Sequence, residues 1–124
     1  MRIIGGKHRG RVLTEFKGEA IRPTADRVKE SVFNILSREI AGARVLDLFC
    51  GSGALGLEAL SRYAAGATLI EMDRAVSQQL IKNLATLKAG NARVVNSNAM
   101  SFLAQKGTPH NIVFVDPPFR RGLL

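Results

Sequence analysis

Short apolar runs separated by longer amphipathic stretches fill the chain from residue 44 onward. Strands are predicted at 44–49, 67–72, 93–98 and 111–115. Helices are predicted at 54–64, 75–88 and 100–106. In the second of these helices Val76, Leu80, Leu84 and Leu87 fall on one side. This alternation predicts an α/β fold with a parallel sheet, right-handed crossovers and helices on both faces.

The first 43 residues have a different pattern. Residues 1–22 contain four glycines between short apolar pairs, which predicts a hairpin with turns. A helix is expected from Pro23 to about Ile40, with Thr24 as its cap. Its apolar stripe would comprise Val28, Val32, Ile35, Leu36 and Ile40. We therefore divide the chain into an arm, residues 1–22, and a body, residues 23–124.

Composition limits the class of protein. The chain has 124 residues, enough for one domain, and its 46% hydrophobic content argues against disorder. No apolar run approaches the roughly 18 residues of a membrane span, and the start does not resemble a secretory signal. The single cysteine, Cys50, fits a reducing compartment, so we expect a cytoplasmic protein with no membrane partner.

The net charge of +8 is concentrated near the start. Residues 1–29 hold eight Lys or Arg against three acids. A basic segment on a nearly balanced body favours a polyanionic partner, although a solubilising surface would look the same. The candidate nucleic-acid contacts are Lys7, Arg9, Arg11, Arg22 and Arg27.

A glycine-rich turn follows the first predicted strand. Gly51, Gly53 and Gly56 fit G-x-G-x-x-G between a strand and a helix, where backbone N–H groups can approach a ligand. Alone, this pattern is also typical of dinucleotide enzymes. Asp47 precedes the glycines, and its carboxylate would repel a pyrophosphate but attract an amine. S-adenosylmethionine (SAM) carries an amine and a sulfonium and no phosphate, so it is the expected cofactor.

The ends of the next two strands add candidate contacts. Glu71 lies 18 residues after Gly53, near the spacing at which an acid binds ribose hydroxyls. Met72 could pack on an adenine face or in the core, and Asn98 could read the adenine edge or serve only as a turn residue. Ala99 completes this candidate set. Asp73 could instead cap the following helix. No cluster of His and Cys predicts a metal.

The last predicted strand ends in Asp116-Pro117-Pro118-Phe119. The prolines stiffen the turn and leave carbonyls free, while Phe119 offers a flat face for stacking. The Asp116 carboxylate and the Pro117 carbonyl could each accept one N–H of a base amine and orient its lone pair toward a methyl donor. Asp116, Pro117 and Phe119 are therefore the candidate catalytic residues.

Four segments in order, "RPTADRVKESVFNIL", "LDLFCGSGALGLEALSR", "EMDR" and "FVDPPF", resemble the RsmD family. The resemblance covers the whole chain and implies a bacterial SAM-dependent enzyme that methylates N2 of a guanine in 16S ribosomal RNA. It also implies a Rossmann-like sheet and a basic N-terminal hairpin that helps to hold RNA. Family members usually have Asp at the position of Asn98. The expected partner is 16S rRNA or the small ribosomal subunit, and the expected full-length state is a monomer.

The family's seven-stranded sheet has the order 3-2-1-4-5-7-6, and the strands predicted here fill only 3-2-1-4. Members are also longer, so we expect this chain to be the N-terminal part of a longer protein. Two other functions stay open from the residues alone. A DNA adenine-N6 methyltransferase needs the same acid-Pro-Pro-aromatic turn, and a non-catalytic module could bind RNA through the basic arm.

Overall fold

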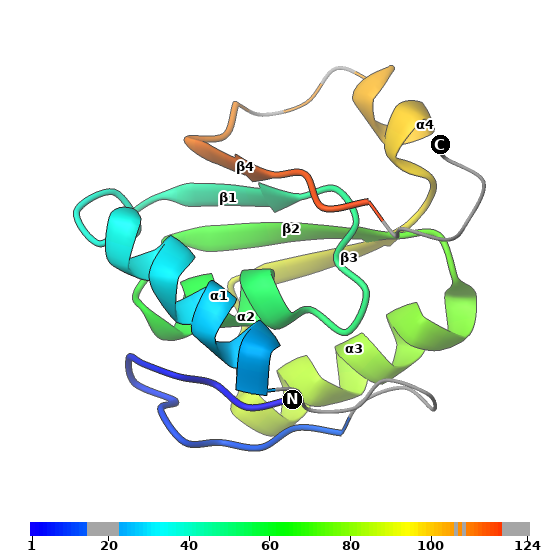
Figure 1. The fold of residues 1–124 in the computed structure, drawn as a ribbon. Coiled ribbons are helices and arrows are strands. Elements are labelled where there is room, and N and C mark those ends of the chain that lie inside the picture. Colours follow the sequence, from blue (N-terminus) through cyan, green and yellow to red (C-terminus); the bar gives the residue numbers. More distant parts are fainter. Residues whose placement is uncertain (15–22, 106, 108, 118–124) are drawn as a thin grey trace.

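The fold is an open parallel sheet with helices on both faces (Figure 1), in a computed structural model that describes residues 1–14, 23–105, 107 and 109–117. The elements are α1 (Pro23–Ile35), β1 (Arg44–Asp47), α2 (Ala54–Ser61), β2 (Gly66–Glu71), α3 (Arg74–Leu87), β3 (Ala92–Asn96), α4 (Ala99–Leu103) and β4 (Ile112–Phe114). Every strand and helix expected from residue 23 onward is present, with ends that differ by a few residues.

The strand order is β3-β2-β1-β4, and all three pairings are parallel. In register, Asp47 lies between Leu69 of β2 and Phe114 of β4. The predicted fold class and the order 3-2-1-4 are therefore confirmed. Because all strands run in one direction, their carboxyl ends share one edge of the sheet, where ligands of such folds bind.

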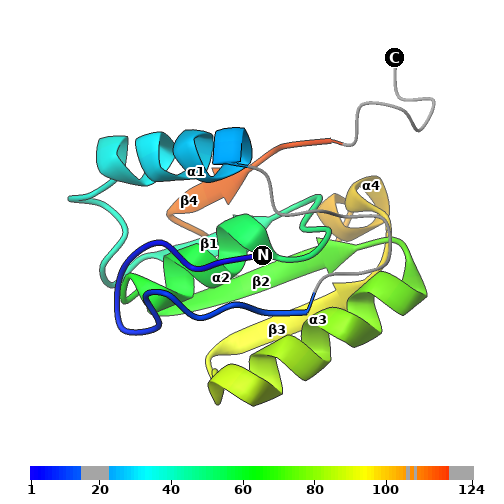
Figure 2. The same cartoon turned by 60° about the horizontal axis from the view of Figure 1, so that its bottom comes forward.

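Two layers of helices cover the sheet. Figure 2 shows α1, α2 and α3 on one face, and α4 on the other. Neighbouring strand residues point to opposite faces, so Val45 and Leu69 join the larger core while Leu46 and Ile70 join the smaller one beneath α4. The predicted stripe of α3 is correct, since Val76, Leu80, Leu84 and Leu87 are all buried.

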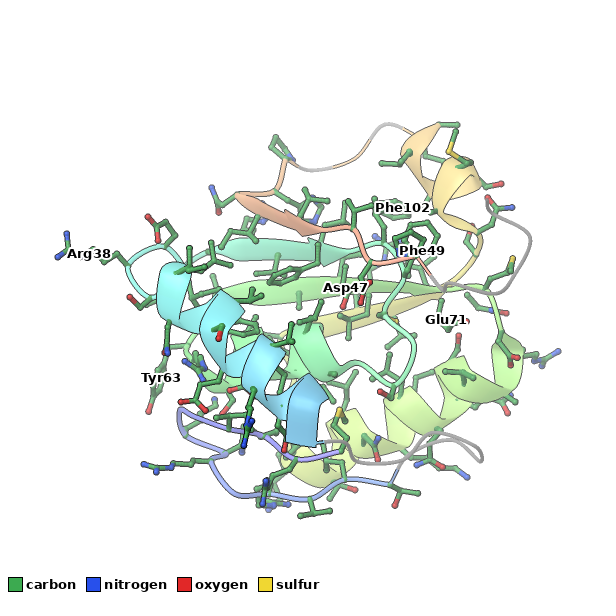
Figure 3. All side chains as sticks on the ribbon, in the orientation of Figure 1. Arg38, Asp47, Phe49, Tyr63, Glu71 and Phe102 are labelled. Carbon is green, nitrogen blue, oxygen red and sulfur yellow. The ribbon has the colours of Figure 1, made fainter. Side chains whose placement is uncertain are left out.

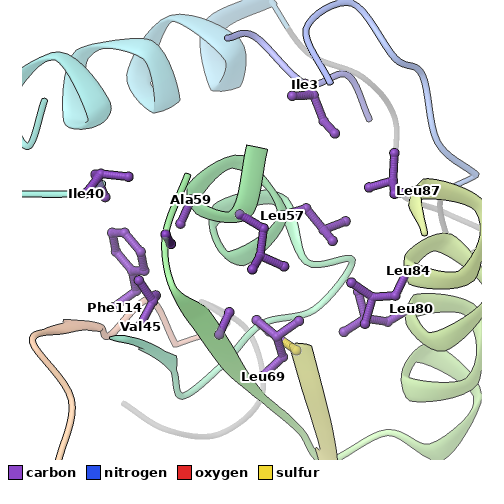
Figure 4. Close-up of a cluster of buried hydrophobic side chains, with 14 of the residues drawn as sticks. Ile3, Ile40, Val45, Leu57, Ala59, Leu69, Leu80, Leu84, Leu87 and Phe114 are labelled. Carbon is purple, nitrogen blue, oxygen red and sulfur yellow. The ribbon is translucent and has the colours of Figure 1, made fainter. Parts of the chain in front are cut away.

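The larger core closes tightly around α2 (Figure 4). Leu57 and Leu69 are both fully buried there. Gly56 allows α2 to approach β2, because a Cβ at this position would lie 2.1 Å from Leu69 Cδ2. Substitution at Gly56 would therefore force the buried Leu69 side chain to move or the helix to shift.

The predicted apolar stripe of the first helix is correct only in part: Ile40 is buried and Val32 and Leu36 pack against the larger core, whereas Val28 and Ile35 do not. The helix ends at Ile35 rather than near Ile40, and Val28 and Ile35 are 60% and 80% exposed. Its buried side also carries Lys29 and Phe33. Lys29 can be buried because its Nζ donates to the carbonyl of Arg2 at 2.6 Å and lies 3.4 Å from a carboxylate oxygen of buried Glu58. The side chain of the expected cap, Thr24, lies outside the described part of the chain.

The N-terminal segment, residues 1–14, packs over α2. Its two limbs are joined antiparallel by the bridge Arg2–Val12, with Leu13 N–H donating to the Met1 carbonyl at 2.8 Å. Oε1 and Oε2 of Glu58 accept the N–H groups of Ile4 and Gly5, both at 2.9 Å. A buried carboxylate on α2 thus fixes the segment that carries the first basic residues. The hairpin itself stays a prediction, and residues 15–22 lie outside the described residues.

Across the described ranges, no helix is both long and apolar enough to cross a bilayer.

Candidate active site

The turn between β1 and α2 has the shape that the glycines predict. Gly53 is the N-cap of α2 with φ 89°, a conformation that side chains disfavour. A Cβ there would also lie 2.5 Å from Leu80 Cδ1. The helix has no side-chain cap, and of the N–H groups in its first turn that of Gly56 donates to Asp47.

Asp47 lies at the carboxyl end of β1, directly before this turn, and is 1% exposed. Its Oδ1 is buried and has no hydrogen-bond partner among residues that the structure describes. Burial raises the pKa of Asp47 to about 7, opposed by the backbone N–H groups of Phe49 and Gly56 and reinforced by the negative charges of Asp116 and Glu71. An unpaired carboxylate oxygen in this position is suited to accept from a cationic or neutral N–H donor.

Glu71 ends β2 and is 9% exposed. Its Oε1 accepts the N–H of Gly51 at 3.1 Å, and its Oε2 accepts the N–H of Asp73 at 2.7 Å. Asp73 in turn caps α3, since its Oδ1 accepts from the N–H groups of Ala75 and Val76. The capping alternative for Asp73 is therefore confirmed, and the predicted spacing does bring Glu71 to the glycine turn.

The candidates near the end of β3 occupy the start of α4. Asn98 caps α4 through Oδ1, which accepts the N–H of Ser101 at 2.7 Å, so its role as a turn residue is confirmed. No bond of its amide nitrogen to another described residue is present, which leaves both N–H donors of that group for a ligand. Ala99 is buried beneath this turn, whereas Met72 is 60% exposed at the end of β2. Met72 as plain core packing is therefore wrong, and its exposed side chain can still cover a ligand.

The corner after β4 lies at the same edge of the sheet. Asp116 and Pro117 are both exposed, and the charge of Asp116 acts on Asp47. The structure thus brings together Asp47, Glu71 and Asp116 from three adjacent strands. Phe119 lies outside the described residues.

Three residues that the sequence did not single out also lie here. Figure 3 shows Phe49 and Phe102 on the same side of the molecule as Asp47 and Glu71. Both rings are half-buried against the smaller core. The Nδ2 of Asn96 donates to the carbonyls of Glu71 and Met72 at 3.0 and 2.9 Å, which ties the end of β3 to the end of β2. A polar residue directly after Val94 and Val95 was the only sequence signal for Asn96.

The basic candidates are only partly gathered. Arg9 and Arg27 line one groove of about 440 Å³ between the N-terminal segment and α1. Arg2, which the sequence did not indicate, lines the same groove, although its Nη2 is paired with Asp26 at 3.0 Å. Lys7 and Arg11 are exposed on the loop outside this groove, and Arg22 lies beyond the described residues.

Other reactive side chains have ordinary structural positions. Cys50 is buried, and burial together with the negative charges of Asp47 and Glu71 raises its thiol pKa. His110 lies 3.4 Å from the hydroxyl of Thr68, and burial lowers the pKa of its ring. In the part of the chain with described coordinates, no group of three His, Cys, Asp or Glu side chains could hold a metal ion.

The sheet order and this edge define a Rossmann-like fold of the kind found in SAM-dependent methyltransferases. A family model described as Conserved hypothetical protein 95 matches residues 1–124, and the chain belongs to this family. The resemblance to the RsmD family drawn from the motifs is thereby confirmed.

Several curated relatives carry a functional name. Ribosomal RNA small subunit methyltransferase D of Escherichia coli is 79% identical over 124 residues, which are all of this chain and 63% of that protein. The protein of the same name from Haemophilus influenzae is 49% identical, with 99% of this chain and 66% of that protein covered. The chain thus spans about two thirds of the length of these relatives.

Solved structures agree with the sequence comparison. The Escherichia coli protein yhhF is 80% identical with a TM-score of 0.91, covering 100% of this chain and 67% of that one. A 16S rRNA N2 methyltransferase of Thermus thermophilus, solved with AdoMet and guanosine, is 29% identical with a TM-score of 0.70. That likeness covers 86% of this chain and 28% of the other.

Proposed function

We propose that this chain carries the cofactor site and catalytic corner of a SAM-dependent methyltransferase that acts on N2 of a guanine in 16S ribosomal RNA. One observation carries the proposal. Among the described residues, the buried Oδ1 of Asp47 lacks a partner, and it lies directly before the glycine turn and the N-terminus of α2. An orphaned buried carboxylate oxygen is costly in the free protein, so a ligand with an ammonium group would satisfy it.

The residues present fit SAM. Asp47 would accept a hydrogen bond from the ammonium group of SAM, and Glu71 would accept from the ribose hydroxyls. The backbone of the glycine turn would lie close to the methionine chain of SAM. Met72 would cover the adenine, while the free amide of Asn98 and the backbone of Ala99 would contact its edge. When bound, SAM supplies an electrophilic methyl group on a sulfonium.

The corner after β4 would act on the base. The Asp116 carboxylate and the Pro117 carbonyl each accept one N–H of the guanine amine, which orients its lone pair and stabilises the positive charge that develops on nitrogen. Phe119 would stack on the base. Asp116 is exposed at this edge, next to the buried pair Asp47 and Glu71, and so lies where a base can enter.

The basic residues would hold the RNA. Arg9 and Arg27 share a groove with Arg2, and Lys7 and Arg11 are exposed beside it. Arg22 completes this set in the proposal. Such contacts would bind phosphates without reading sequence. The names of the relatives support small-subunit rRNA as the substrate. The cytoplasmic location and the monomeric state of the full-length protein stay predictions.

The test is a methyl-transfer assay with tritiated SAM. The chain is offered small-subunit rRNA, small-subunit particles and duplex DNA, with the Escherichia coli relative as a positive control. Label in N2-methylguanine of the RNA supports the proposal. Label in DNA alone would identify an adenine methyltransferase instead, and RNA binding without SAM binding or transfer would identify a non-catalytic module.

A further inference from the structure

Tyr63 occupies a backbone position that normally belongs to glycine. It follows α2 and its C-cap Arg62 with φ 72°. The N–H of Tyr63 donates to the Leu60 carbonyl and the N–H of Ala64 donates to the Ala59 carbonyl, both at 3.1 Å. These two bonds form a Schellman motif, in which the left-handed residue is usually glycine because a side chain is strained there. A bulky aromatic residue is a clear outlier at this position.

The side chain of Tyr63 gives the fold little in return. It is 60% exposed, and its hydroxyl has no hydrogen bond to any residue that the structure describes. The motif is held by backbone bonds and by the burial of Ala64, neither of which requires an aromatic ring. Strain that is retained at an exposed side chain points to a role outside the fold.

Two other segments, each carrying basic residues, contact the end of α2 beside Tyr63. The N–H groups of Lys7 and His8 donate to the carbonyl and hydroxyl of Ser61, at 2.8 and 2.9 Å, so the N-terminal loop lies on the last turn of α2. On the other side, the Gly42 N–H donates to the Tyr63 carbonyl at 2.9 Å and brings in the segment after α1. Figure 3 shows Arg38 of that segment and Tyr63 both pointing away from the sheet.

The charges of this surface suit an anion. Lys7, Arg38 and Arg44, which begins β1, are all exposed. Glu39, directly after Arg38 in the sequence, is an exposed acid. An exposed aromatic ring with exposed cations on the adjoining segments is a combination that binds unpaired nucleotides, because the ring stacks on bases and the cations hold phosphates.

We propose that Tyr63 is a stacking platform for an unpaired nucleotide of the RNA substrate, with Lys7 and Arg38 as its phosphate contacts. This inference rests on the proposed function. Tyr63 precedes β2, whereas Glu71 ends it, so the platform lies about 20 Å from the methylation edge at the usual rise of a strand. Only an RNA that extends this far from its target guanine reaches both places.

The experiment compares Tyr63→Gly and Tyr63→Phe with the parent chain. Fluorescence anisotropy measures binding of a small-subunit rRNA fragment with unpaired segments and of a short guanine-containing oligonucleotide. We expect Tyr63→Gly to weaken binding of the fragment roughly 5- to 100-fold and to leave the short oligonucleotide unaffected. Tyr63→Phe keeps the ring and should bind the fragment as the parent does. Because glycine relieves the strain, the Tm of Tyr63→Gly should be unchanged or higher by a few degrees.

Equal affinity of Tyr63→Gly and the parent chain for the fragment would overturn the inference while leaving the proposed function intact. A lower Tm of Tyr63→Gly that accounts for the weaker binding would also overturn it, since the ring would then be structural. Absence of RNA binding by the parent chain would count against the proposed function as well. As a second measurement, Arg38→Ala should reduce the salt dependence of fragment binding, and an unchanged slope would contradict the phosphate contact.

Discussion

Glu71 at the end of β2 holds Gly51 of the turn after β1, with Oε1 accepting the glycine N–H at 3.1 Å. The second oxygen accepts the N–H of Asp73 at 2.7 Å. One buried side chain therefore fixes two backbone turns at the carboxyl edge of the sheet. Its geometry sets the shape of the proposed cofactor site before any ligand binds.

Glu71→Gln tests this double role. Glutamine can accept only through its oxygen, so one of the two N–H groups loses its acceptor. We expect the free energy of unfolding to fall by about 1–3 kcal/mol, measured by urea denaturation. SAM affinity, measured by calorimetry, should fall at least about tenfold if the acid also binds the ribose. Asp73→Asn is the matched control, because asparagine caps a helix nearly as well and should leave both quantities close to the parent values.

Asp47 makes the stability of the ligand-free protein depend on pH. Burial raises its pKa to about 7 from an ordinary value of 3.8, so between these values the folded protein holds a proton that the unfolded chain releases. The contribution of Asp47 to the free energy of unfolding therefore falls as pH rises from about 4 to 7, and it is constant above pH 8. The shift corresponds to roughly 4 kcal/mol at most.

Asp47→Asn should remove that pH dependence. The amide resembles the protonated acid, so the variant should be more stable than the parent at pH 8 and similar to it at pH 4. Denaturation at a series of pH values gives the difference directly. The same variant should bind SAM much more weakly, because the amide cannot pair with an ammonium as a charge. A variant that is no more stable at pH 8 would show that the buried carboxylate is satisfied in solution.

The order of strands and helices could be predicted because the spacing of apolar residues along the chain distinguishes the two kinds of element. In a parallel α/β fold, a short apolar run such as "NIVFV" predicts a buried strand, and the spacing of Leu80 and Leu84 on α3 predicts a helix. The buried side of α1 could be predicted only in part in this way. Its buried face includes Lys29, which is stabilised by Glu58 from α2 and by a carbonyl of the N-terminal segment. Partners that are 29 and 27 positions away in the chain leave no periodic signal.

The sequence likewise predicts some features of the candidate site and not others. Asp47, Glu71 and the glycine turn follow from their positions at strand ends, because parallel strands bring those ends together. The capping role of Asn98 and the exposure of Met72 depend on local geometry that spacing does not fix. The strain at Tyr63 is likewise invisible in the sequence, since tyrosine itself gives no sign of a positive φ.

Asp116→Ala separates chemistry from cofactor binding. The carboxylate is exposed at the corner after β4, and the proposed mechanism uses it only to accept from the base amine. Methyl transfer to rRNA should fall by at least about 100-fold, while SAM affinity changes less than threefold. Transfer is measured with tritiated SAM and affinity by calorimetry. Lost SAM binding with intact turnover would show that the assigned role is wrong.

Glu58 is expected to hold the N-terminal segment on the body. It is fully buried, accepts from Ile4 and Gly5, and pairs with Arg62 Nε at 2.8 Å and Lys29 Nζ at 3.4 Å. Glu58→Ala would leave the buried Lys29 without a carboxylate and should lower the free energy of unfolding by about 3–5 kcal/mol.

Combining Glu58→Gln with Lys29→Met removes both charges and should recover part of that loss, although Arg62 then lacks its partner. The exposed Glu39→Ala serves as the control and should change stability by less than about 0.5 kcal/mol. If instead Glu58→Ala unfolds like the parent chain, while limited proteolysis still spares residues 1–14, the segment must be held by its apolar contacts through Ile3 and Leu13 rather than by the buried acid.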